Sequence, residues 1–143
     1  MPQSGHRAGV AQVLTALAAA AVLLHLYGLY RPGGPTSPLW FGHLDKVEHL
    51  LGFAAPVCLI LLARRSVGPG SRLFDAVVLV VFALHAALSE VVQHYLYAGR
   101  RTGDPFDVLA DVLGTALGWW VAILLAPRVL NGAVTGRTGG NRA

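Results

Sequence analysis

The sequence predicts an all-α fold, a four-helix transmembrane bundle with short loops. Of its 143 residues, 55% are hydrophobic and only 13% are charged, whereas soluble domains carry about a quarter charged residues. So short a soluble chain could not enclose this much apolar surface, so lipid is the expected solvent. Four separate apolar runs reach the roughly 20 residues that a helix needs to cross a bilayer.

The four expected helices follow one another through connections rich in Gly and Pro. They cover residues 10–30, 45–63, 73–97 and 106–126. The first run exceeds the apolar segment of a cleaved signal peptide, so we expect it to remain as a helix. We expect three parts in order: a cytoplasmic N-terminus (1–9), a membrane domain (10–126) and a flexible, basic cytoplasmic tail (127–143).

Lys and Arg are distributed unevenly between the two sides of the predicted bundle. The side that includes both termini holds Arg7, Arg64, Arg65, Arg72, Arg128, Arg137 and Arg142, and the other holds Arg31, Lys46, Arg100 and Arg101. The positive-inside rule therefore predicts a multi-pass protein of the cell membrane with both termini in the cytoplasm. We interpret the modest basic excess as this topology signal and expect no nucleic-acid partner. Cys58, the single cysteine, can form no disulfide within the chain.

Six of the seven acidic residues map to the predicted outer ends of the last three helices. They are Asp45, Glu48, Glu90, Asp104, Asp107 and Asp111, joined there by Lys46, His49, Gln93, His94, Arg100 and Arg101. A charged side chain near the bilayer centre costs roughly 2.5–3.5 kcal/mol, so these residues should face the bundle interior. For Asp45, Glu48 and Asp104, helix capping is the structural interpretation that the spacing favours.

Glu90, Asp111 and His49 lie too far inside their helices to act as caps. Two polar residues follow Glu90 at helical spacing and are expected to share its face, Gln93 and His94. We predict a functional site here, with a buried structural network as the alternative. Gly114 and Gly118 form a small-xxx-small pair, which is more typical of helix packing than of chemistry.

The same residues carry a resemblance to a known family. The segments are Asp45-Lys46-Val47-Glu48-His49, Glu90-Val91-Val92-Gln93, Arg101 followed six residues on by Asp107, and Asp111-Val112-Leu113-Gly114. In order and in placement on the last three helices, they resemble the VanZ family over about residues 40–120. The resemblance implies a small integral membrane protein of the cell envelope. Some relatives are associated with resistance to teicoplanin-type lipoglycopeptide antibiotics. The family often has Asn where this chain has Asp111, which argues against a role that needs a neutral amide there.

The first of three functions left open is an outer-facing pocket that binds or modifies an envelope lipid or a lipoglycopeptide-related ligand. Lys46 and Arg101 would hold an anionic head group, because ammonium and guanidinium groups bind phosphate strongly. Four further residues are expected in the ligand-binding site: Asp45, Gln93, Asp107 and Asp111. Glu90 and His49 are the candidate catalytic acid and base, and the sequence leaves open whether the chain is an enzyme.

The second function is a non-enzymatic scaffold or shielding protein, and the third is a proton or cation site. The third follows from charge, because six acidic residues face only three Lys and Arg in the polar cluster. A metal site with the H-E-x-x-H pattern is absent from the sequence, so we expect no metal ligands, and the sequence leaves the cofactor unknown. The expected partners are membrane lipids, among them an anionic envelope lipid or a lipoglycopeptide.

Overall fold

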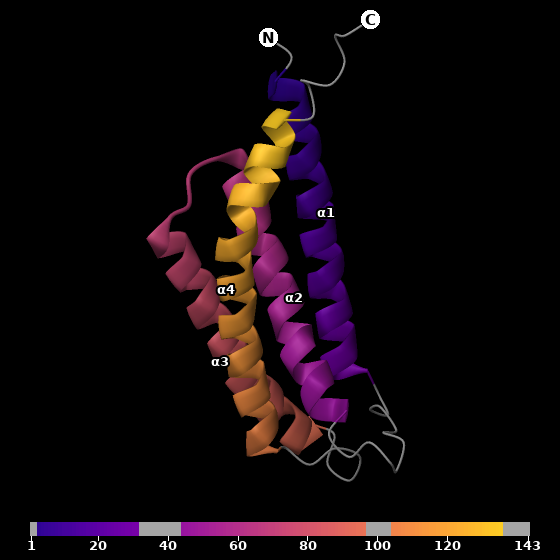
Figure 1. Cartoon of the computed structure of the whole chain (residues 1–143). Coiled ribbons are helices and arrows are strands. Elements are labelled where there is room, and N and C mark those ends of the chain that lie inside the picture. The colour runs from indigo at the N-terminus through magenta and orange to yellow at the C-terminus, as the bar shows by residue number, and fades with distance from the viewer. Residues whose placement is uncertain (1–2, 32–43, 97–103, 136–143) are drawn as a thin grey trace, which may run out of the picture.

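The computed structural model describes residues 3–31, 44–96 and 104–135. Within these residues the chain forms four α-helices and no strand: α1 (Gln3–Tyr30), α2 (Leu44–Val67), α3 (Arg72–Leu96) and α4 (Pro105–Thr135). Each helix holds 24 or 25 consecutive residues that are apolar enough to span a membrane. The predicted all-α, four-helix transmembrane bundle is therefore confirmed (Figure 1).

The helices extend beyond the apolar runs that predicted them. α1 begins at Gln3 instead of near residue 10, and α4 continues to Thr135 instead of ending near Ala126. Hydropathy locates the part of a helix that crosses lipid, whereas the helix itself can continue through further turns. The first part of the expected tail, residues 127–135, is therefore helical, while Tyr97 and residues 136–143 lie outside the described residues.

α2 lies in the centre of the bundle between α1 and α4, and α3 crosses α4 at an angle (Figure 1). α2 and α4 approach closely because α4 carries glycine where the two helices meet. A Cβ atom on Gly114 would overlap the carbonyl oxygen of Leu50, and one on Gly118 would overlap that of Ala54. The packing role predicted for the glycine pair is confirmed.

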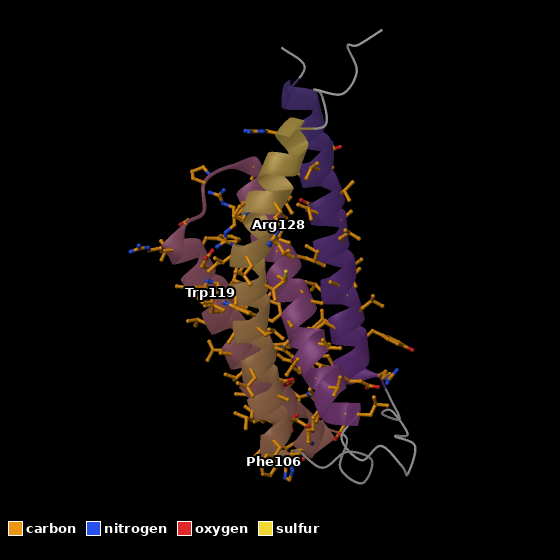
Figure 2. The ribbon with its side chains drawn as sticks, viewed as in Figure 1. Phe106, Trp119 and Arg128 are labelled. Carbon is orange, nitrogen blue, oxygen red and sulfur yellow. The ribbon has the colours of Figure 1, made fainter. Side chains whose placement is uncertain are left out.

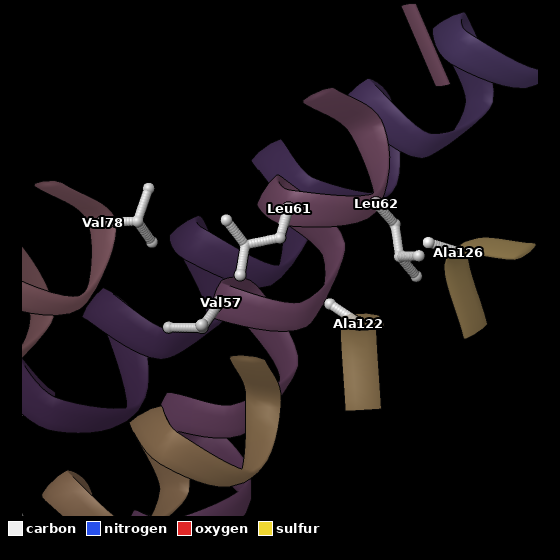
Figure 3. Close-up of a cluster of buried hydrophobic side chains, with 6 residues drawn as sticks. All are labelled: Val57, Leu61, Leu62, Val78, Ala122 and Ala126. Atoms are coloured by element: carbon white, nitrogen blue, oxygen red, sulfur yellow. The ribbon is translucent and has the colours of Figure 1, made fainter. Parts of the chain in front are cut away.

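Two apolar clusters join the helices. The larger one links α2, α3 and α4 (Figure 3) and consists of Val57, Leu61, Leu62, Val78, Ala122 and Ala126. The smaller one links α1, α2 and α3 through Leu29, Phe53 and Ala86. Because α2 contributes to both clusters, several of its side chains are fully enclosed, with Phe53, Val57 and Leu61 at 0% exposure.

The bundle is apolar on its surface and partly polar inside, as expected for a protein whose solvent is lipid. Large apolar side chains are exposed on all four helices, for example Leu24 at 70%, Leu73 at 75%, Leu84 at 67% and Phe106 at 69%. The buried polar residues include Ser66, Ser89, Glu90, Gln93, Asp107, Asp111 and Thr115. In water this distribution would be unfavourable, whereas a bilayer covers the apolar surface and forces polar groups to find partners within the bundle.

A partly buried ion pair ties three helices together where α2 finishes and α3 begins. The Arg65 Nη2 atom donates to Oδ2 of Asp75 at 2.5 Å, and the indole Nε1 of Trp119 donates to the same oxygen at 3.2 Å. Figure 2 shows Trp119 on the side of α4 that faces α3. Asp75 is the one acidic residue that the sequence placed away from the predicted site, and its partners give it a structural role.

Candidate functional site

The polar end of the bundle, where α1 and α3 finish and α2 and α4 begin, gathers the other acidic residues (lower end of Figure 1). They fall into two groups that differ in burial. The lysine cluster is Lys46 with Asp45, Asp104 and Asp107, and the buried triad is His49 with Glu90 and Asp111. Glu48 belongs to neither group, since its ionic partner is Arg31, the residue after α1, at 3.9 Å.

The lysine cluster places one ammonium group among three carboxylates. Nζ of Lys46 donates to Oδ2 of Asp45 at 3.0 Å, to Oδ2 of Asp104 at 2.6 Å and to Oδ1 of Asp107 at 2.5 Å. An ammonium has three N–H donors, so each carboxylate takes one. The side chains of Asp45 and Asp104 are 37% and 36% exposed, whereas that of Asp107 is 11% exposed. The cluster therefore lies at the boundary between the bundle interior and its surface.

Asp104 begins α4 and is the predicted N-cap. Its Oδ1 accepts from the backbone N–H of Phe106 at 2.9 Å, and its carbonyl accepts from the N–H of Asp107 at 2.8 Å. Pro105 occupies the first helical position, where a missing N–H costs nothing. The hydrogen bond from Lys46 holds the pKa of the Asp104 carboxyl below its ordinary value, because the positive charge favours the ionised form. The capping role predicted for Asp104 is confirmed.

Asp45 differs from its predicted capping role. α2 begins at Leu44, so Asp45 lies in the first turn instead of at the N-cap, and its carboxylate bonds to Lys46. Glu48, the other half of the expected capping box, faces Arg31.

The buried triad brings one residue from each of α2, α3 and α4 into contact distance. Nδ1 of His49 and Oδ1 of Asp111 are 2.9 Å apart, and one nitrogen or oxygen atom from each of His49, Glu90 and Asp111 lies within 4.8 Å of the others. The side chains of His49 and Asp111 are 9% and 0% exposed, and Glu90 is 8% exposed. The three residues singled out from the sequence because caps could not explain them are therefore neighbours.

Two contacts connect the triad to the lysine cluster. Oε2 of Glu90 accepts from the backbone N–H of Asp104 at 2.9 Å, which fixes the carboxylate from one side. Oδ2 of Asp107 lies 3.9 Å from Nε2 of His49, while Oδ1 of the same residue bonds Lys46. The start of α4 therefore positions both groups.

Two carboxylate oxygens of the triad are buried without a hydrogen-bond partner among the described residues, Oε1 of Glu90 and Oδ2 of Asp111. None of the ion pairs formed by described Lys and Arg residues includes either carboxylate. A buried polar atom without a partner costs roughly 1–3 kcal/mol, and more when it is charged. Such an arrangement can hold a proton, exchange one with a ligand or bind a cation.

The remaining predicted site residues lie apart from the triad or outside the described part of the chain. Gln93 is 3% exposed and donates through Nε2 to the carbonyl of Leu29 at 3.4 Å, which joins α3 to the end of α1. The prediction that His94 shares the buried face of Glu90 is wrong. His94 is exposed and packs against Tyr95, with ring centroids 5.0 Å apart, because successive helix residues point about 100° apart. Arg101 lies outside the described residues.

Two histidines outside the predicted site form a second polar feature inside the bundle. The rings of His25 in α1 and His85 in α3 have centroids 5.2 Å apart, and both rings contact Phe53. His25 is 7% exposed, and Nε2 of each histidine is buried without a partner among the described residues. The pair extends the polar interior from the triad toward the smaller apolar cluster.

The sequence of α2 contains a pattern that could have indicated the position of His25. Pro56 has no N–H, so the carbonyl of Gly52 four residues earlier lacks its helical donor. Gly52 also lacks a side chain, and Nδ1 of His25 lies 3.7 Å from the position that its Cβ would occupy. A Gly-x-x-x-Pro segment in a transmembrane helix can thus mark the place where a neighbouring helix brings a polar side chain.

Comparison with known proteins places the chain in a family. Neither the curated proteins nor the solved structures give a match. A family model described as VanZ/LLP1 matches residues 10–126, which is most of the chain and includes both the lysine cluster and the buried triad. The four membrane-spanning helices and the order of the site residues agree with the resemblance read from the sequence. The chain therefore belongs to the VanZ/LLP1 family.

Proposed function

We propose that this protein binds, and chemically acts on, the polar head group of an envelope lipid or of a lipoglycopeptide-related ligand at the polar end of its bundle. The observation that carries the proposal is the buried triad of His49, Glu90 and Asp111. Ionisable groups within membrane-spanning segments are costly and usually mark a functional site. If stability were the only requirement, apolar side chains of similar size would be neutral or better at these positions.

The lysine cluster is the proposed entrance for an anionic head group. Lys46 already donates to three carboxylates, so a phosphate must replace one of them to reach its ammonium. Asp45 is the easiest to replace, because its bond is the longest of the three at 3.0 Å and its side chain is 37% exposed. Arg101, three residues before Asp104, is the proposed second cation for the same head group.

Glu90 and His49 are the proposed acid and base. The contact between Nδ1 of His49 and Asp111 would place the proton of a neutral imidazole on Nδ1 and leave Nε2 to accept one. A carboxylate that orients a histidine in this way is a recurrent arrangement in acid–base catalysis. Oε1 of Glu90 is buried and has no partner among the described residues, so it is available to a ligand that enters the site.

We place the polar end at the outer face of the cell membrane, with both termini in the cytoplasm. The charge count along the sequence supports this orientation. Tyr27 and Tyr95 lie near the polar end on α1 and α3 and are 65% and 74% exposed, as expected for aromatic residues at a membrane interface. In this orientation the site faces the envelope, where lipid-linked precursors and lipoglycopeptides are found.

A non-enzymatic scaffold or shielding role is the second candidate. It is favoured by the bonds that join helix ends, namely those from Lys46 to Asp104 and Asp107 and from Gln93 to Leu29. A scaffold needs these bonds for stability and has no use for the unpartnered oxygen atoms of the triad. The two roles therefore differ in what neutral substitutions in the triad should do.

Lipid retention in nanodiscs tests the proposed ligand site. The purified full chain is placed in nanodiscs of mixed phosphatidylglycerol and phosphatidylcholine, and retained lipids are identified by native mass spectrometry. We expect enrichment of phosphatidylglycerol for the wild type and loss of that enrichment for Lys46→Gln and Arg101→Ala. Glu48→Gln is the matched control, because it removes a charge at the same end from a side chain that is 45% exposed. Equal retention by all four proteins would contradict the head-group site.

Deletion of the gene, with envelope-lipid profiling and teicoplanin susceptibility as readouts, tests the role in the cell. We expect wild type and Glu48→Gln to restore the lipid profile of the deletion strain, whereas Glu90→Gln does not. A profile that the deletion leaves unchanged would contradict the proposed function. Restoration by Glu90→Gln would favour the scaffold. If teicoplanin susceptibility does not change together with the lipid profile, the link to resistance is rejected, whereas the proposed lipid function stands.

A further inference from the structure

We propose that His49, Glu90 and Asp111 bind a divalent transition-metal ion of the Mn²⁺ or Zn²⁺ class. The three residues come from three different helices, and one donor atom of each lies within 4.8 Å of the others. Two donors that share an ion at roughly 2.0–2.2 Å lie at most about 4.4 Å apart, so small side-chain adjustments from the 4.8 Å limit bring all three within reach of one ion. This group is the one cluster of three potential ligands found among the described residues.

The unpartnered oxygens are an independent observation that points to a ligand. Asp111 is 0% exposed and Glu90 is 8% exposed, yet Oδ2 of the first and Oε1 of the second have no hydrogen-bond donor among the described residues. The other oxygen of each carboxylate is bonded, to His49 and to the backbone N–H of Asp104 respectively. Each carboxylate is thus held at one oxygen and open at the other, as in metal sites whose ligands are oriented by neighbouring hydrogen bonds.

Charge supports a cation in the triad. Lys46 forms ion pairs with Asp45, Asp104 and Asp107, whereas no described Lys or Arg forms an ion pair with Glu90 or Asp111. Two ionised carboxylates and a neutral imidazole bind a divalent ion with no net charge left over, which removes the cost of isolated charges at membrane depth. Uncompensated, the same two carboxylates would repel an anionic head group.

The donor set selects the class of metal. An imidazole nitrogen favours transition metals over Mg²⁺ and Ca²⁺, which prefer oxygen ligands, and the absence of thiolates from the triad disfavours Cu⁺. Three protein ligands leave at least one coordination position for water or for an oxygen of a bound phosphate. With an ion bound, His49 and Glu90 are ligands, and this role replaces the acid and base roles proposed above. The use of the open position for a head group rests on the proposed function, whereas binding of the ion can be measured without any lipid ligand.

Metal binding is tested on the full chain in phosphate-free detergent solution, after EDTA treatment and buffer exchange. Isothermal titration with MnCl₂ or ZnCl₂ alone, together with elemental analysis after gel filtration, gives affinity and stoichiometry. We expect one ion per chain for the wild type and for Glu48→Gln, and at least roughly 10- to 100-fold weaker binding for Asp111→Asn and Glu90→Gln. Variants are compared only if their helical circular dichroism matches the wild type, and Glu90→Gln decides should Asp111→Asn not fold.

Absence of a stoichiometric ion from the wild type, or an affinity unchanged in the folded triad variants, would overturn the metal site and leave shared protons in the triad. The lipid experiment is separate from this result. Mn²⁺ or Zn²⁺ binding without phosphatidylglycerol enrichment would keep the metal site and reject the head-group function. Phosphatidylglycerol enrichment that persists in EDTA with no ion bound would reject the metal site and keep the head-group function.

Discussion

Asp75 and Asp111 offer a matched comparison between a carboxylate with structural partners and one with a proposed functional role. Oδ2 of Asp75 accepts hydrogen bonds from both Arg65, at 2.5 Å, and Trp119, at 3.2 Å. Asp111 is more deeply buried, but its one bonded oxygen contacts His49 and the other has no partner among the described residues. We predict that Asp75→Asn strongly destabilises the bundle, whereas Asp111→Asn changes its stability little.

The expected magnitudes follow from these contacts. Breaking a buried ion pair costs about 3–5 kcal/mol, and we expect the lower value, about 3 kcal/mol, because the side chains of Arg65 and Asp75 are still 12% and 15% exposed. For Asp111→Asn, loss of charge assistance in the bond to His49 costs about 1 kcal/mol. Removing a buried charge with an unpartnered oxygen returns a similar amount, so the net change should stay within about 1 kcal/mol.

The assay is unfolding of the metal-free protein in mixed micelles with increasing SDS, followed by far-ultraviolet circular dichroism. EDTA is present throughout, so that a bound ion does not add to the stability of the wild type. If Asp111→Asn costs as much free energy of unfolding as Asp75→Asn, the triad is a structural network and the reasoning toward a functional site is refuted.

Three further predictions concern the packing and the polar end. Gly118→Ala should destabilise the bundle by about 1–3 kcal/mol or more in the same SDS titration, because the new Cβ overlaps backbone of α2, and a wild-type midpoint would contradict the close approach. Because the pKa of Asp104 is lowered in the folded protein, its ionised carboxylate stabilises the fold above the ordinary aspartate pKa, and this stability is lost as pH falls through the lowered pKa. Below about pH 4, Lys46→Gln should therefore lose less free energy of unfolding with falling pH than the wild type does. If the two proteins lose the same free energy of unfolding between neutral and acidic pH, the ion pair between Lys46 and Asp104 does not form. Gln93→Ala should cost about 1 kcal/mol by removing the hydrogen bond between Gln93 and the carbonyl of Leu29, and no loss of stability would count against that bond.

The sequence was sufficient for the number and type of elements because hydropathy and length determine which segments cross lipid. It did not determine where the helices end, since α1 and α4 continue past their apolar runs. Glu90 and Asp111 could be identified one helix at a time, because a carboxylate at membrane depth needs a reason wherever its partners are. In the structure these two residues lie together, so the cost of a carboxylate at membrane depth is an informative signal in a single helix.

Contacts between helices could not be predicted, because they depend on helix rotation and crossing. The spacing of Glu90, Gln93 and His94 is compatible with one shared face, yet the rotation of α3 buries the first two and exposes the third. The pairing of His25 with His85 likewise joins two different helices, so no spacing within one helix could predict it. The expectation of no metal ligands rested on a motif confined to one helix, whereas the metal site proposed for the triad draws on three.

The most direct test asks whether the ionisable side chains of His49, Glu90 and Asp111 meet in one buried place. It uses three double-mutant cycles, one for each pair of the variants His49→Gln, Glu90→Gln and Asp111→Asn. The readout is the free energy of unfolding in SDS for each single and double variant without added metal. Direct contact predicts coupling energies of about 0.5–3 kcal/mol in all three pairs. Additive effects, within about 0.5 kcal/mol in every pair, would show that the three side chains do not meet.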